Sequence, residues 1–158
     1  MLLYFLRHGE AEKGAPGGAD AQRRLTPEGE AENRLCLLAA RRAGARPDAV
    51  VHSPLVRAAQ TARMAAEILE PVGGARPDDR LACGAGLLEV QAVAEAYPAE
   101  ALMLVGHNPD FSEIVGELIG EARVVLKTSG LACVSLPVVE AGAGQLEWLI
   151  KPKLFGPD

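Results

Sequence analysis

Residues 2–9 of the chain read LLYFLRHG, an apolar run that ends in an arginine, a histidine and a glycine. A short, continuous apolar run predicts a buried β-strand, and the polar residues after it predict a turn at its carboxyl end. Gly9 would give such a turn its backbone freedom. Arg-His-Gly is too short to indicate a site by itself, since an ordinary strand-end turn explains it equally well. Its meaning depends on what the rest of the chain places beside it.

The order of strand, polar residues and helix recurs twice further along the chain. Residues 48–52 and 101–105 are mostly apolar and predict two more buried strands. After each strand, a polar residue followed by proline (Ser53-Pro54 and Asn108-Pro109) predicts a helix with a side-chain N-cap. These helices are expected to end near residues 69 and 119. Strands that alternate with helices predict an α/β fold with a mostly parallel central sheet flanked by helices.

The remaining segments predict the rest of the architecture. Thr26, Pro27 and an acidic first turn predict a helix that continues to about Ala43, where Gly44 ends it. Residues 9–25 are rich in glycine, alanine and charge, and they predict a loop. We also expect a weak strand near 80–82, a helix over about 86–97, and an antiparallel hairpin of strands 131–136 and 145–150 at one edge of the sheet.

Length and composition fit one domain over residues 1–158, with 49% hydrophobic residues available for a core. Residues 151–158 contain two prolines and a glycine and predict a loose tail. A formal net charge of −5 argues against nucleic-acid binding, which needs an extended basic face. No apolar run approaches the roughly 20 residues that cross a bilayer, and the apolar start is too short for a signal peptide. We therefore expect no membrane association and a cytoplasmic location, with the three cysteines reduced and structural.

Polar side chains follow each of the three clear strands at its carboxyl end. Arg7 and His8 follow the first, Arg57 lies in the helix after the second, and His107 follows the third. Ligands of open α/β sheets bind at the carboxyl ends of the strands, so these residues are expected to meet in one crevice. Arginine forks match phosphate oxygens, and a neutral imidazole beside a phosphoryl group can attack phosphorus. Nearby arginine charge would lower the pKa of a histidine and keep it neutral.

Each of these residues also has a structural explanation when it is taken alone. His107 fits a hydrogen-bonded histidine at a helix start, and Arg57 fits a solvated helix residue. His52 ends the second strand and could line the crevice rim, but a structural role explains it better. His8, His107 and Asp110 could in principle hold a metal ion. The two arginines would repel a cation there, so no metal site is predicted.

Three motifs, in this order, resemble those of the histidine phosphatase superfamily. Residues 6–11 (LRHGEA) are similar to its first signature, residues 53–62 (SPLVRAAQTA) to its second arginine motif, and residues 105–108 (VGHN) to its second-histidine motif. The resemblance covers residues 2 to about 136 and implies a phosphoglycerate-mutase-like three-layer sandwich. Residues 24–29 (RLTPEG) and 127–130 (KTSG), together with the absence of large helical insertions, resemble the small SixA-type phosphohistidine phosphatases.

The resemblance implies a role for each matching residue. His8 is implied to be the nucleophile that is transiently phosphorylated. Arg7 and Arg57 are implied to bind phosphate, and His107 to contact the phosphoryl group. Arg24 is implied to extend the phosphate pocket. No cofactor is implied.

The proton donor for the leaving group stays open at this point. Many members of the superfamily use an acidic residue, and Glu10 is the candidate nearest in sequence to the nucleophile; Glu12, Asp20 and Glu89 are others. A phosphorylated imidazole is a comparatively good leaving group, because its nitrogen is readily protonated. A phosphohistidine enzyme could therefore work without a dedicated acid. Asn108 could donate a hydrogen bond at the site, with helix capping as an equal alternative.

The residues and the resemblance together predict a metal-independent phosphatase that acts through a phosphohistidine intermediate on His8. The expected substrate is phosphohistidine on a partner protein such as a phosphotransfer domain, because a crevice without capping insertions suits a protein-borne phosphoryl group. One alternative is a phosphatase for a small phosphorylated metabolite, although 4% aromatic residues offer little for gripping such a ligand. The other is a non-catalytic phosphoprotein-binding module, which would have no need for an intact His8.

Overall fold

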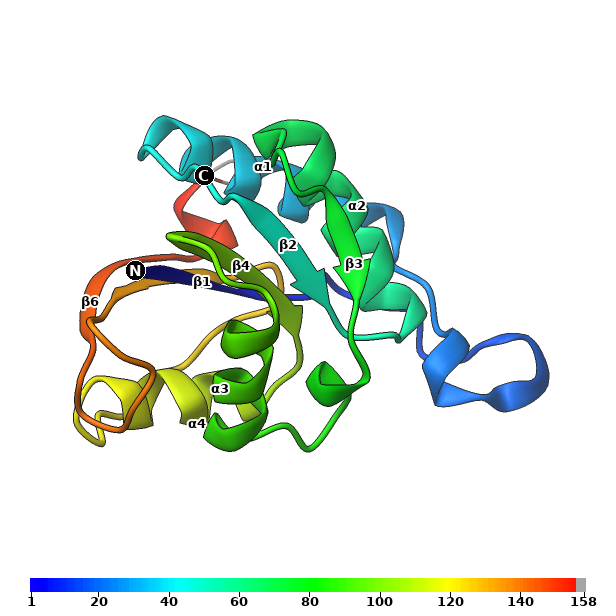
Figure 1. Cartoon of the computed structure of the whole chain (residues 1–158). Coiled ribbons are helices and arrows are strands. Elements are labelled where there is room, and N and C mark those ends of the chain that lie inside the picture. Colours follow the sequence, from blue (N-terminus) through cyan, green and yellow to red (C-terminus); the bar gives the residue numbers. More distant parts are fainter. Residues whose placement is uncertain (156–158) are drawn as a thin grey trace.

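The structure, a computed structural model that describes residues 1–155, is built around one six-stranded sheet of order β3-β2-β4-β1-β5-β6 (Figure 1). The pairs β1–β4, β2–β4 and β2–β3 are parallel, whereas β5 runs antiparallel to both β1 and β6. The mostly parallel sheet with an antiparallel edge hairpin is therefore confirmed. The strands are β1 (Leu2–Arg7), β2 (Ala49–His52), β3 (Ala75–Pro77), β4 (Ala101–Gly106), β5 (Leu131–Ser135) and β6 (Gln145–Ile150).

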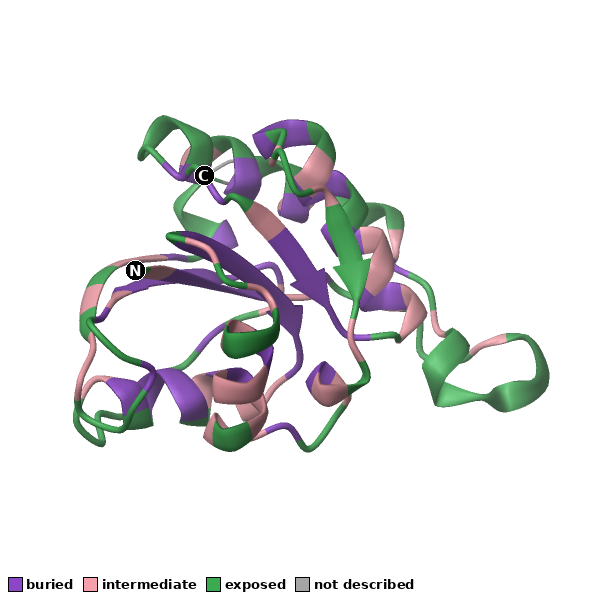
Figure 2. Cartoon of the chain, in the orientation of Figure 1, coloured by how far each residue is buried: buried purple, intermediate pink, exposed green. Residues whose placement is uncertain are grey.

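Helices cover both faces of the sheet and make three layers. The helices α1 (Pro27–Arg42) and α2 (Val56–Leu69) lie on one face, and α3 (Leu87–Ala96) and α4 (Asp110–Leu118) lie on the other (Figure 1). Alternate residues of β1 serve two cores, with Tyr4 and Leu6 on the α1–α2 side and Leu3 and Phe5 on the α3–α4 side. Figure 2 shows the central strands buried and the outer surfaces of the helices exposed. Burial on both faces explains why these strands are continuously apolar in sequence.

The start of α1 is as predicted. Thr26 precedes Pro27, and the Thr26 hydroxyl accepts a hydrogen bond from the Gly29 backbone N–H at 3.0 Å. Gly44 follows the helix with a φ of 90°, a left-handed conformation that favours glycine.

The side-chain caps predicted for the other two helices are wrong. Helix α2 begins only at Val56 and α4 only at Asp110, and neither has a side-chain cap. The physical reason is that tertiary contacts take both polar side chains. Ser53 contacts a histidine from the next segment, described below, and the Asn108 amide donates to the Leu126 carbonyl at 2.9 Å.

The strand predicted at 80–82 is also wrong. The chain forms the short edge strand β3 earlier and then a 3-10 helix at Asp79–Leu81. Asp78 explains the difference, because its carboxylate accepts from both the Arg80 backbone N–H at 3.0 Å and the Arg80 Nε at 2.9 Å. Such a local side-chain bond favours a turn over a strand.

Residues 10–25, hereafter the arm, project from the body of the molecule (Figure 1, blue, on the right). Two 3-10 helices, Pro16–Gly18 and Asp20–Gln22, interrupt the loop that the sequence predicted. The arm is closed at its base by a bridge between Ala11 and Leu25. At the other end of the chain, Pro152–Leu154 form a 3-10 helix with Pro152 buried, and residues 156–158 of the predicted loose tail lie outside the described residues.

Candidate active site

Three chain segments meet at the carboxyl edge of the parallel strands. Arg7 of β1 is paired with Gly106 of β4, and His52 of β2 is paired with Val105 of the same strand. The His8 backbone N–H donates to the Gly106 carbonyl at 3.1 Å. The residues that directly follow the three strands, His8, Ser53 and His107, are thereby held side by side.

His8 keeps one ring nitrogen free of a proton. Its Nδ1 lies 2.7 Å from the Gly9 carbonyl oxygen, which can only accept, so Nδ1 carries the proton. Its Nε2 therefore has a lone pair, to which the Arg57 Nε donates at 3.3 Å. Burial lowers the pKa of His8 from its usual 6.5 to about 4; the charges of His107, Arg57 and Arg7 act in the same direction, and the bond to Gly9 opposes them. A neutral imidazole with an available lone pair is the form that can act as a nucleophile.

His107 presents the opposite hydrogen-bonding face. Its ring centroid lies 5.2 Å from that of His8, its side chain is 2% exposed, and its Nε2 lies 2.7 Å from the Ser53 hydroxyl. That hydroxyl accepts from the Leu55 backbone N–H at 3.3 Å and can donate its own proton to Nε2 of His107. In that tautomer the His107 proton is on Nδ1, which is buried and has no partner among residues 1–155. Burial, followed by the charge of Arg57, lowers the pKa of His107 to about 4.

Arg57 is buried rather than solvated, with 4% of its side chain exposed. Its two terminal nitrogens donate to Asp20, one to the carbonyl oxygen at 3.0 Å and one to the carboxylate at 3.2 Å. One turn further along α2, Thr61 donates to the Arg57 carbonyl at 2.9 Å and accepts from the Gly9 backbone N–H and the Asn33 amide. This buried network joins α1, α2 and the turn after β1, and it holds the Arg57 backbone in place.

Buried polar atoms without partners gather around His8. Within the described part of the chain these include Arg7 Nε, His107 Nδ1 and the Ser129 hydroxyl. The Ser129 backbone N–H donates to the His8 carbonyl at 3.1 Å, and Arg7 uses one terminal nitrogen on the Leu126 carbonyl at 2.9 Å. An unpartnered buried donor is costly. A bound oxyanion would supply acceptors to these groups next to the His8 lone pair.

Comparison with known proteins places the chain in a family. The family described as histidine phosphatase superfamily (branch 1) matches residues 3–124. The chain belongs to the histidine phosphatase superfamily. It is 31% identical over 158 residues to the phosphohistidine phosphatase SixA of Escherichia coli (strain K12). The aligned region covers 96% of this chain and 94% of that protein. It is also 38% identical over 118 residues to an uncharacterized protein of Picosynechococcus sp., covering 72% of this chain and 70% of that protein.

The fold comparison agrees with the sequence comparison. A structure of the protein histidine phosphatase SixA complexed with tungstate matches with a TM-score of 0.87 and 27% identity, over 99% of this chain and 100% of that one. The predicted membership, the phosphoglycerate-mutase-like fold and the assignment to phosphatases are therefore confirmed.

The carboxyl groups considered as proton donors in this phosphatase differ in position. Glu10 and Glu12 are exposed, and their carboxylates have no hydrogen-bond or ion-pair partner among residues 1–155. The Glu89 carboxylate accepts from the Gly86 backbone N–H at 2.8 Å and caps α3. Of the four candidates, Asp20 alone contacts the cluster.

Asp20 is held in its ionised form. Hydrogen bonding from Arg23 and the charge of Arg57 lower the pKa of the Asp20 carboxyl, with the Arg23 Nε at 2.8 Å. Arg23, and not Arg24, is thus the arginine of the arm that joins the network. Arg24 is exposed in a shallow pocket with Pro16, Gln22 and Val56, and no hydrogen bond within the described chain joins its guanidinium to the cluster. The i,i+3 spacing of Asp20 and Arg23 is the sequence signal that could have indicated this pair.

The other polar residues near the cluster have structural partners. His52 is buried, and its Nδ1 donates to the Ser53 carbonyl at 2.8 Å, in agreement with the structural interpretation of this residue. Asn108 holds the Leu126 segment rather than capping a helix. Ser53, Thr61 and Ser129 were not predicted, because their contacts join segments far apart in sequence.

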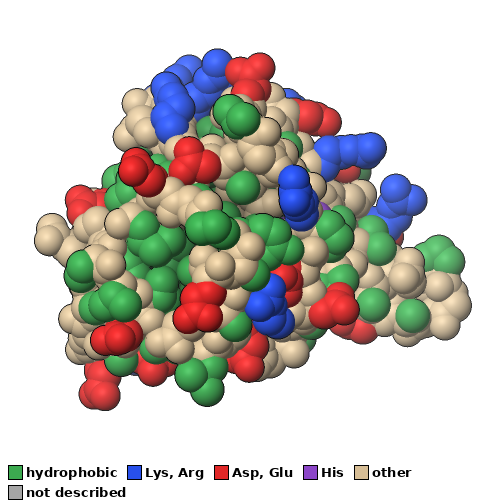
Figure 3. All heavy atoms as spheres, in the orientation of Figure 1, with side chains coloured by type: hydrophobic (Ala, Val, Ile, Leu, Met, Phe, Trp, Pro, Cys, Tyr) green, Lys and Arg blue, Asp and Glu red, His purple; other side chains and the backbone are tan. Residues whose placement is uncertain are grey.

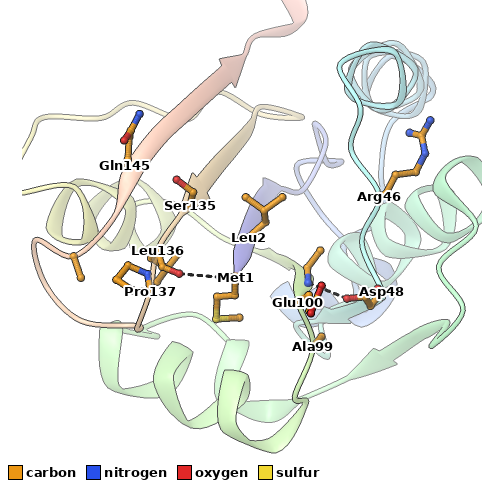
Figure 4. Close-up of a pocket in the computed structure, with 12 residues that line it drawn as sticks. Met1, Leu2, Arg46, Asp48, Ala99, Glu100, Ser135, Leu136, Pro137 and Gln145 are labelled. Atoms are coloured by element: carbon orange, nitrogen blue, oxygen red, sulfur yellow. Dashed lines mark hydrogen bonds between the residues drawn. The ribbon is translucent and has the colours of Figure 1, made fainter.

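A larger pocket than those next to His8 lies at the other edge of the sheet (Figure 4). It has a volume of about 840 Å³ and is lined by the amino ends of the strands, including Leu2 and Ala101. There the Met1 amino group donates to the Leu136 carbonyl at 2.9 Å, and the Asp48 carboxylate accepts from the Ala101 N–H at 2.9 Å. A six-residue strand, roughly 20 Å long, separates this pocket from His8. Pocket size alone would therefore have indicated the wrong edge.

None of the helices within residues 1–155 has the length and apolar character needed to span a bilayer. Over the same residues, no three His, Cys, Asp or Glu side chains are grouped as ligands for a metal ion.

Proposed function

We propose that this phosphatase removes the phosphoryl group from phosphohistidine on a partner protein, through a covalent intermediate on His8. The observation that carries the proposal is the complementary pair of imidazoles. His8 offers a lone pair on Nε2, and His107 offers an unpartnered Nδ1–H beside it. A nucleophile and a hydrogen-bond donor to the phosphoryl oxygens are both needed for phosphoryl transfer.

In the first step, the His8 Nε2 lone pair attacks phosphorus. The bond from phosphorus to the substrate nitrogen breaks, and its electron pair stays on that nitrogen, which takes a proton from water. Arg57 must first withdraw its Nε from the His8 lone pair. Its guanidinium then binds phosphoryl oxygens together with Arg7 and the His107 Nδ1–H, and these donors stabilise the charge of the transition state.

In the second step, water attacks the phosphorus of phospho-His8. The bond from phosphorus to Nε2 breaks, its electron pair returns to the ring, and inorganic phosphate leaves. Throughout both steps the hydrogen bond from Nδ1 to the Gly9 carbonyl fixes the ring and stabilises the positive charge that the phosphorylated imidazole carries. No resident cofactor takes part in either step.

The carboxyl groups support phosphohistidine as the substrate. Asp20 is the carboxyl that contacts the cluster, and its lowered pKa makes it a poor proton donor. An alkoxide leaving group needs such a donor, whereas an imidazole leaving group is readily protonated by solvent. The cluster therefore suits a phosphoramidate better than a phosphomonoester. Three free cysteines, two of them buried, fit a reducing compartment, and we place the protein in the cytoplasm as part of the same proposal.

The test is phosphate release from a phosphohistidine-bearing phosphotransfer domain and from p-nitrophenyl phosphate, both with EDTA present. Wild type, His8→Ala and the control Arg63→Ala, at an exposed position of α2, are compared. We expect wild type and the control to act on the phosphohistidine domain in EDTA, and His8→Ala to lose at least about 1,000-fold in rate. Acid-labile phosphate should be trapped on wild type and not on His8→Ala.

Three results would contradict the proposal. Retained turnover in His8→Ala would show that His8 is not the nucleophile. Activity that EDTA abolishes would show that the reaction depends on a metal ion. Turnover of p-nitrophenyl phosphate alone would favour a small-molecule phosphatase.

A further inference from the structure

A depression lined by lysines lies beside the candidate active site. It has a volume of about 410 Å³, and Lys127, Lys151 and Lys153 line it together with Glu32 and Thr128. The chain has only four lysines, so three of them gather in one place. All three are exposed, and none of them has an ion-pair partner among residues 1–155.

This gathering is unusual for the surface of this molecule. Acidic residues outnumber basic ones by 21 to 16, and the face drawn in Figure 3 carries side chains of both kinds. One acidic residue, Glu32, lines the depression beside three lysines, so repulsion among the like charges is only partly offset. The depression therefore carries a net positive charge that a negatively charged partner would neutralise.

The chain topology places this depression at the same edge of the sheet as His8. Strand β6 ends at Ile150, which is paired with Leu131, and Leu131 is paired with Leu6 of β1. Lys151 therefore leaves the sheet two strand spacings from β1, roughly 10 Å away.

The second wall of the depression is tied to the nucleophile more directly. Thr128 precedes Ser129, whose backbone N–H donates to the His8 carbonyl at 3.1 Å. Residues 151–155 lie against α1 (Figure 1, red), and α1 also carries Asn33 of the buried network around Arg57. A protein bound over the lysines would thus have a neighbouring part of its own surface close to His8.

We propose that Lys127, Lys151 and Lys153 form a docking surface for an acidic face of the protein that carries the phosphohistidine. This inference rests on the proposed function and adds to it the charge of the partner. A single phosphohistidine ring gives few contacts, so recognition of a whole protein needs area outside the catalytic crevice. Charges at the rim of such an interface act mainly on the association rate and make it sensitive to salt.

The test compares Lys151→Gln/Lys153→Gln with the control Arg42→Gln/Arg63→Gln. Both pairs are exposed and unpaired among the described residues, and both remove two positive charges. The two lysines are chosen because they lie outside the segments that contact His8. The substrates are a phosphotransfer domain of net negative charge, phosphorylated on histidine, and free phosphohistidine. Thermal melts check that each variant is folded.

We expect kcat/KM on the acidic domain to fall about tenfold in the lysine variant at low ionic strength, with a flatter salt dependence. The value for free phosphohistidine and the values for the arginine control should stay within twofold of wild type. Unchanged kcat/KM on the domain, with wild type active, would overturn the docking surface alone. Equal losses on both substrates would show that the lysines bind the small phosphorylated group, which also overturns it. A wild type inactive on both substrates would overturn the proposed function and the docking surface with it.

Discussion

At the scale of single residues, the serine beside His107 is the contact that gives the two histidines different roles. The Ser53 hydroxyl accepts a hydrogen bond from the Leu55 N–H and can donate one to Nε2 of His107. Without the hydroxyl, Nε2 would itself take the proton in some molecules, and Nδ1 would then no longer donate to a phosphoryl oxygen. We classify Ser53 as a positioning residue.

Ser53→Ala is expected to lower kcat about tenfold, equivalent to about 1.4 kcal/mol of transition-state stabilisation, with a smaller change in KM. Steady-state kinetics on the phosphohistidine domain measure both quantities. Ser135→Ala is the matched control, since its hydroxyl is bonded to Glu147 at the far end of β5. A rise in KM alone, or equal losses in both variants, would mean that Ser53 does not position His107.

Residue patterns predicted the cluster only in part, for a physical reason. Arg7 ends a buried strand, and His8 and His107 directly follow buried strands, so their place at one sheet edge could be expected from element order. The bonds from Arg57 to Asp20 and from His107 to Ser53 join residues 37 and 54 positions apart. No local pattern specifies such a pair.

At the scale of elements, the arm neutralises part of the positive charge that would bind phosphate. Asp20 of the arm binds both terminal nitrogens of Arg57, and its negative charge lies where phosphoryl oxygens would compete for the same guanidinium. Phosphate binding must therefore displace the Asp20 carboxylate. The arm extends from the body and is largely exposed, so few packing contacts oppose such a movement (Figure 2).

Asp20→Asn should strengthen product inhibition. The substitution removes a charged competitor for the Arg57 guanidinium, so the inhibition constant for inorganic phosphate should fall a few-fold, with kcat within twofold of wild type. Inhibition curves for Asp20→Asn and for Asp79→Asn, an exposed acid without an ion-pair partner among residues 1–155, measure this. A collapse of kcat in Asp20→Asn would identify Asp20 as the proton donor instead.

The elements that the sequence predicted well are those buried on both faces. Strands β1 and β4 are continuously apolar because helices cover both sides of the sheet. Strand β3, with the sequence Ala-Arg-Pro, is exposed along its length and gives no hydrophobic signal. The helix starts after Ser53 and Asn108 were misplaced, because the residue types that cap helices also make the tertiary bonds of a site.

At the scale of the whole molecule, the two histidines of the cluster, His8 and His107, make stability depend on pH. The pKa values of His8 and His107 are about 4 in the folded chain, and a histidine in an unfolded chain has a pKa of about 6.5. Above pH 6.5 neither state binds these protons, and the stabilisation is fully present. As the pH falls from 6.5 toward 4, the unfolded chain binds two protons that the folded chain does not bind. The free energy of unfolding therefore decreases.

Between pH 6.5 and pH 5, each histidine should remove about 1.6 kcal/mol from the free energy of unfolding. This window lies above the range in which carboxylates with lowered pKa values, such as Asp20 and Asp78, begin to contribute. Denaturant unfolding at pH 6.5, 6.0, 5.5 and 5.0 measures how steeply the free energy of unfolding changes with pH. His8→Asn and His107→Asn should each remove about half of this slope, because asparagine does not titrate there.

Equal slopes in wild type and both variants would mean that the folded chain accepts these protons. The imidazoles would then be charged in mild acid, and His8 would lose its lone pair there, so kcat should fall over the same pH range. With the pKa near 4, the catalytic rate instead persists down to about pH 4 while the free energy of unfolding already declines.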